Sequence, residues 1–154
     1  RNERALDSFG RAPAPTTNAY ILWTLLESGT APVELSREIG HVKKISLQSE
    51  DSYIRALGAN ILFLAHDGKN ALSLASGLAA SQEKNGAVGG GKTTITCSGG
   101  DSLKIETTSL AVLAWLRIDG RVAPNVESAM KWLFERCKNG RFGSTPCFEG
   151  DQRL

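Results

Sequence analysis

The sequence predicts an all-α domain in which helical hairpins stack in two concentric layers. Helix-length runs end at polar–glycine pairs, and apolar runs alternate with amphipathic ones. A glycine just past a helix end adopts the left-handed conformation without a Cβ clash, so these pairs indicate helix C-termini. The alternation is typical of stacked hairpins with an inner and an outer row. The pairs are Ser28-Gly29, Asp67-Gly68, Asn85-Gly86, Asp119-Gly120 and Asn139-Gly140.

Start signals between these stops define six helices. Thr17 precedes the first run, Pro32 opens the second, and Pro124 suits the first turn of the last. The polar stretch 49–51 precedes the third run. We expect helices over residues 17–28, 32–48, 50–66, 69–84, 107–118 and 124–138 of one domain or domain fragment, residues 1–154.

The hydrophobic pattern assigns these helices to layers. Residues 20–23, 59–65 and 110–116 are apolar almost all round, which is typical of helices buried on most sides. The second, fourth and sixth helices have a polar face and are expected outside. One segment differs, because Lys92–Cys97 is rich in β-branched residues and Ser98–Asp101 has turn chemistry. With the alternating residues Leu103–Ile105, it predicts a small β-hairpin near residues 92–105.

Composition excludes several classes of protein. The 154 residues are 41% hydrophobic and 22% charged, which is typical of a soluble globular domain. The net charge of +2 is too small for a nucleic-acid surface, and no apolar run is long enough to span a membrane. The chain begins without Met or an apolar signal segment, so we expect a processed piece or a fragment. Three cysteines, Cys97, Cys137 and Cys147, allow either one disulfide with a free thiol or three thiols.

The segment Gly86–Thr93 fits the phosphate-binding pattern G-x-x-x-x-G-K-[ST]. A P-loop needs a buried strand before it and a helix after it, so that amides and the helix N-terminus converge on phosphate. Here a polar helix end precedes the pattern and a strand-like run follows Lys92. Asp119 could mimic a magnesium-binding acid. We expect a flexible glycine-rich linker, with a P-loop nucleotide-binding protein as an alternative.

Other reactive side chains do not assemble a site in the sequence. His41 is expected on the surface of a helix, and His66 at a helix end where an imidazolium favours terminal carbonyls. Neither has the clustered ligands that a metal site needs. Cys137 lies beside two basic residues but has no histidine nearby. Trp115 and Trp132 are expected in the core. We therefore predict no catalytic residue, no metal and no cofactor.

Four segments resemble the thioester-containing domain of the α2-macroglobulin and complement family. Residues 105–116 look like its E-T-T/A-x-Y-A-L-L-A-L-L helix, and residues 129–133 resemble its A-V-K-W-L helix. Residues 140–145 resemble G-G-F-G-S-T, and residues 51–58 are similar to R-S-Y-x-x-A-x-A. Their order and spacing agree with the family. After Thr145 the family continues Q-x-T, whereas this chain has Pro-Cys-Phe.

The resemblance implies a partial α/α toroid of about three helical hairpins. The family's reactive thioester joins Cys and Gln within G-C-G-E-Q, upstream of the matched region, and no such motif occurs here. Its acyl-accepting histidine also lies upstream. The matched positions therefore carry over only as fold signatures. They are Tyr53, Glu106, Thr107, Thr108, Trp132, Gly143, Ser144 and Thr145.

The function implied is a non-enzymatic scaffold segment of a protease-trapping inhibitor, part of the wall that shields the thioester. Its partners would be the rest of the parent chain and, for the parent, target proteases, in an extracellular, periplasmic or cell-envelope setting. A terpenoid-cyclase or prenyltransferase toroid is disfavoured because Asp51, Asp67, Asp101 and Asp119 are isolated. A helical-repeat protein-binding module is a further alternative. Half a ring would leave inner helices without neighbours, so we expect self-association or a rearranged bundle.

Overall fold

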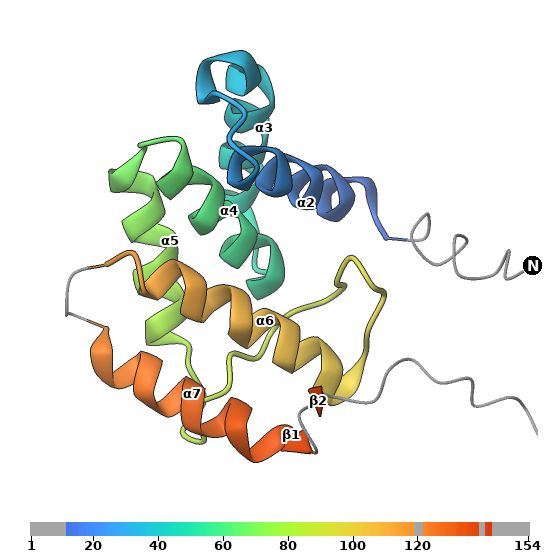
Figure 1. Cartoon of the computed structure of the whole chain (residues 1–154), viewed down its shortest axis with the longest axis vertical. Helices are drawn as coiled ribbons and strands as arrows, with labels where there is room; N and C mark the ends of the chain where they lie inside the picture. The colour runs from blue at the N-terminus through green and yellow to red at the C-terminus, as the bar shows by residue number, and fades with distance from the viewer. Residues whose placement is uncertain (1–11, 119–121, 139–140, 143–154) are drawn as a thin grey trace, which may run out of the picture.

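The computed structural model describes residues 12–118, 122–138 and 141–142 (Figure 1). This part is mostly helical, as the sequence predicts. The elements are α2 (Ala14–Glu27), the 3-10 helix η1 (Pro32–Leu35), α3 (Ser36–Gln48), α4 (Ser52–Leu64), α5 (Gly68–Ala80), α6 (Gly100–Trp115) and α7 (Ala123–Arg136), followed by β1 (Cys137–Lys138) and β2 (Arg141–Phe142). β1 and β2 pair antiparallel.

Helix α4 is the centre of the core. Every residue of α4 except Arg55, Phe63 and Leu64 is buried. Figure 1 shows α4 among α2, α3, α5 and α6, and it packs against all four. Gly58 makes the approach of α3 possible, because a Cβ there would lie 2.2 Å from the Ser46 hydroxyl oxygen. The apolar character of the 59–65 run thus correctly predicts a helix buried on most sides.

The contacts between helices centre on α4. α4 packs against both α2 and α6. α3 packs on α2 and α4, α5 packs mainly on α4, and α7 packs on α6. Trp115 and Trp132 are 1% and 2% exposed, which confirms their predicted place in the core.

Some helix ends differ from the prediction. Gly29 closes α2 in the left-handed conformation, with φ of 95°, as expected. Gly68, however, is the first residue of α5, and His66, with φ of 60°, takes the left-handed position after α4. The helix boundary moves because Asp67 accepts a hydrogen bond from the Asn70 N–H and caps α5. Gly86 has φ of 96° but lies in a turn well past the end of α5.

The β-hairpin predicted near residues 92–105 is wrong. No strand occurs at residues 92–99, and α6 begins at Gly100, so Leu103–Ile105 is helical. Three alternating residues are too few to separate strand from helix, and Leu103 fits the helical spacing of the buried residues that follow it. Its carbonyl accepts a hydrogen bond from the Thr107 hydroxyl one turn later, at 2.8 Å. None of the described helices is long and apolar enough to cross a membrane.

Candidate functional site

The glycine-rich loop, defined here as residues 86–98, connects α5 to α6 and packs against α4, α6 and α7. Ala87 and Val88 are fully buried, and Ile95 is 3% exposed. The turn before it is closed by two backbone hydrogen bonds, from the Glu83 N–H to the Ala87 carbonyl and from the Gly86 N–H to the Glu83 carbonyl. The expected flexible linker is therefore wrong, because apolar side chains in the loop anchor it in the core.

The N-cap and the first two residues of α4 hold the far half of the loop. Asp51 Oδ1 caps α4 by accepting from the Tyr53 N–H at 2.9 Å, and it also accepts from the Lys92 N–H at 3.1 Å. The Tyr53 hydroxyl oxygen accepts from the Ile95 N–H at 3.4 Å. The Ser52 N–H donates to the Gly90 carbonyl. Burial raises the pKa of Tyr53 well above its ordinary value, so it holds Ile95 as a neutral phenol.

Three consecutive residues of α6 hold the loop from the other side. Thr108 Oγ1 accepts from the Val88 N–H at 2.9 Å. Glu106 Oε1 accepts from the hydroxyl groups of Thr94 and Thr96. Thr107 is fully buried, and a Cβ on Gly91 would lie 2.7 Å from its hydroxyl oxygen. The glycine at 91 thus allows the loop backbone to lie directly on α6.

A second set of contacts fixes the beginning of the loop. Lys104 Nζ forms an ion pair with Glu83 Oε1 at 2.8 Å, and this hydrogen bond holds the pKa of Glu83 below its ordinary value. The Gln82 side-chain amide donates to the Gly86 carbonyl and to the Asn125 carbonyl of α7. Gly86 itself packs against α7, because a Cβ there would lie 2.1 Å from the Ser128 carbonyl oxygen.

The loop geometry is unlike a phosphate cradle. The N–H groups of Ala87, Val88 and Lys92 already donate to side-chain oxygens, which belong to the turn before the loop, to α6 and to the N-cap of α4. Residues 92–95 form no helix, so no helix N-terminus follows the pattern directly. The chemistry of Gly86–Thr93 here is that of a packed structural loop.

The remaining predicted residues do not gather at one place. His41 is exposed on α3, as expected, and Cys97 is exposed with φ of 56°. Cys137 is partly buried at the start of β1. Within the described ranges, no group of three His, Cys, Asp or Glu residues could hold a metal ion. Asp119, Gly143, Ser144, Thr145 and Cys147 lie outside the described residues.

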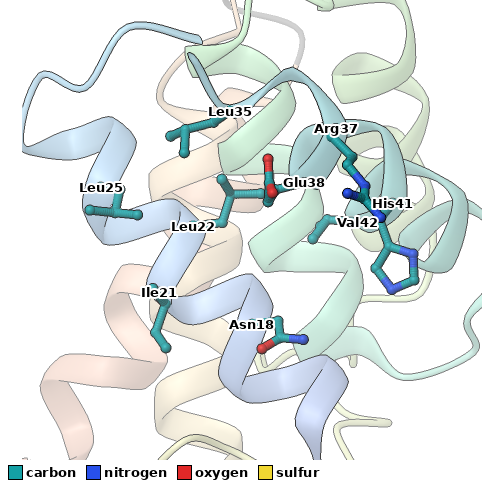
Figure 2. Close-up of a pocket in the computed structure, with 9 residues that line it drawn as sticks. All are labelled: Asn18, Ile21, Leu22, Leu25, Leu35, Arg37, Glu38, His41 and Val42. Carbon is teal, nitrogen blue, oxygen red and sulfur yellow. The ribbon is translucent and has the colours of Figure 1, made fainter. Parts of the chain in front are cut away.

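An open groove lies between α2 and α3, with a volume of about 450 Å³. Figure 2 shows that one side comes from α2 and the other from η1 and α3. Its wall includes Ile21 and Leu25, which are 50% and 39% exposed. The groove is lined by Asn18, Ile21, Leu22, Leu25, Leu35, Arg37, Glu38, His41 and Val42.

Sequence reasoning missed both the groove and the dual contact of Asp51. The spacing of Asn18, Leu22 and Leu25 on one face of α2 was the available signal for the groove. For Asp51 the signal was its place before an apolar helix, which indicates an N-cap but not the contact with Lys92. Comparisons of the chain with protein-family models, curated proteins and solved structures gave no match.

Proposed function

We propose that this chain is a scaffold segment of an α2-macroglobulin-like protease-trapping inhibitor. In this proposal it forms part of an α/α toroid, with α2, α4 and α6 as inner helices and α3, α5 and α7 as outer helices. The observation that carries the proposal is the row of contacts α2–α4–α6, with each following helix packed on that row. A single four-helix bundle does not need this order.

The signature positions within the described residues support the same proposal. Tyr53, Glu106 and Thr108 each bond the glycine-rich loop, and Thr107 packs on it. These residue types are needed because the buried loop has donors that must find acceptors. This arrangement supports a scaffold role, since these polar groups of the matched segments hold a loop.

The decisive experiment examines the parent chain. We expect about 200 residues of sequence immediately upstream of this segment to contain further helical hairpins. A C-x-E-Q motif there would identify a thioester-bearing parent, whose purified form should trap a protease after bait cleavage and lose this ability with methylamine. An upstream region without helical hairpins would contradict the proposal. The isolated 154-residue chain should neither inhibit nor cleave proteases.

A helical-repeat binding module is the second candidate, and the α2–α3 groove favours it. The groove combines apolar side chains with Arg37, Glu38 and His41 at its edge, which is a common composition for helix-binding grooves. A nucleotide titration with magnesium separates both candidates from the P-loop alternative. ATP binding that is abolished by Lys92→Ala would contradict the scaffold proposal.

A further inference from the structure

Helix α2 exposes apolar side chains although its sequence carries almost no charge. Glu27, its last residue, is the only charged residue of the helix. A helix with so little charge is more typical of a position that is covered on most sides. In this chain α2 packs on α4 and α3, yet Ile21 and Leu25 remain exposed. This face of α2 is therefore suited to contact another protein surface.

The exposed side chains of α2 border a hollow on the same face of the molecule. The groove between α2 and α3 has a volume of about 450 Å³, and the buried side chains of Leu22 and Val42 are part of its lining. Figure 2 shows Ile21 and Leu25 on the α2 side of this groove. Apolar side chains that project and an apolar hollow thus share one face. Two identical copies can each offer such a face to the other, because a two-fold contact uses the same patch twice.

The charges at the rim of the groove are also complementary to themselves. Arg37 and Glu38 are exposed neighbours on the α3 side, and neither forms an ion pair with another described residue. In a two-fold dimer, every contact between two residues occurs twice with the roles exchanged. Arg37 of each copy can therefore face Glu38 of the other. A rim with one charge of each sign favours a second copy over a partner whose surface has a single sign of charge.

We propose that two copies of this chain pair about a two-fold axis at the α2–α3 groove. Ile21 and Leu25 of each copy fill the groove of the other, and Arg37 faces Glu38 of the second copy at the rim. The interface then has an apolar centre and a charged rim, which is the usual anatomy of a protein contact. The pairing does not depend on the proposed function, because it uses only the groove and its rim.

Charge reversal at the rim tests the pairing. Sedimentation velocity of the full 154-residue chain, from about 10 μM to about 1 mM, should show dimers that increase with concentration. Arg37→Glu makes both rims acidic and Glu38→Arg makes both rims basic. Each variant alone should dimerise about tenfold more weakly, because each change acts twice in a two-fold dimer. An equimolar mixture of the two variants should form a mixed dimer, since an acidic rim then meets a basic one.

Matched reversals on α7 are the control. Glu127→Lys and Lys131→Glu change exposed residues away from the groove, so these variants should dimerise like the unmodified chain, alone or mixed. Circular dichroism checks that every variant is folded. If a reversal prevents folding, the neutral changes Arg37→Gln and Glu38→Gln replace it, and each should weaken the dimer by a smaller factor.

Three results would overturn the proposal. The first is an unmodified chain that stays monomeric over the whole concentration range. The second is a pair of rim variants that dimerise as well as the unmodified chain, or whose mixture associates no more tightly than either variant alone. The third is growth into oligomers larger than a dimer, because a two-fold contact is saturated by one second copy.

Discussion

The glycine-rich loop and the α2–α3 end of the molecule differ in how secondary structure relates to burial. The loop has no regular structure, yet Val88 is fully buried and its N–H is bonded to Thr108. The α2–α3 end is regular helix, yet Ile21 is 50% exposed and borders a groove. Burial in this protein therefore follows tertiary contacts and not the presence of secondary structure.

Two glycines with nearly the same backbone conformation, one in each region, allow the difference between the regions to be tested by substitution. Gly86→Ala should destabilise the loop by about 3–4 kcal/mol, from the left-handed penalty plus overpacking against the Ser128 carbonyl. Gly29→Ala at the α2–α3 end should cost about 1–2 kcal/mol, because its Cβ meets nothing within 4 Å. Urea denaturation measures both, and equal losses would contradict the difference between the two regions.

Removing one hydroxyl group in each region should give the next largest difference in stability. Thr108→Val should reduce the free energy of unfolding by about 1–3 kcal/mol, since the buried Val88 N–H loses its only described acceptor. The matched change is Ser28→Ala, whose hydroxyl donates to the Leu25 carbonyl in an exposed position. It should change stability by less than about 0.5 kcal/mol. A Thr108→Val protein as stable as Ser28→Ala would show that the loop is not held by this bond.

Acid should weaken both regions slightly. The Lys104 and Lys43 ammonium groups hold the pKa values of Glu83 and Asp67 below their ordinary values. Carboxylates with lowered folded-state pKa values stabilise the fold above the unfolded pKa, about 4, and this contribution is lost as pH falls through the folded value. Glu83→Gln and Asp67→Asn should therefore each flatten the stability profile below about pH 4.

The size of this acid effect is limited by solvent. Both ion pairs are partly exposed, and such pairs contribute little to stability. Chemical denaturation at pH 7 and pH 3 measures it, with exposed Glu34→Gln as the control. If stability falls as steeply with pH in Glu83→Gln and Asp67→Asn as in the unmodified chain, these two carboxylates do not cause the loss of stability in acid.

The difference between these regions also explains what the sequence can predict. The apolar run in α4 predicts a buried helix because most directions around that helix meet protein. The glycine pattern at 86–93 suggests a linker because its letters do not reveal that Thr108 and Asp51, distant in sequence, accept its N–H groups. The start of α6 at Gly100 is missed for a related reason, since Leu103–Ile105 alternates over too few residues.

Substitutions in the groove should have the smallest effect on stability. Their effect should instead be seen in self-association of the chain. Exposed Ile21 and Leu25 offer apolar surface that a second copy can bury, so we expect the chain to self-associate. Ile21→Gln with Leu25→Gln should shift sedimentation velocity profiles toward the monomer. The unfolding free energy should change by no more than about 0.5 kcal/mol per substitution, because both side chains are largely solvated.

A control on η1 shows whether this surface is specific. Val33 is 79% exposed and does not line the groove, so Val33→Gln should leave association unchanged. If Val33→Gln dissociates the protein as strongly as the groove variants, association reflects general apolar exposure. If the unmodified chain is a monodisperse monomer at every concentration, the exposed apolar face is stable in water alone. Either result would show that the groove is not a specific self-association surface.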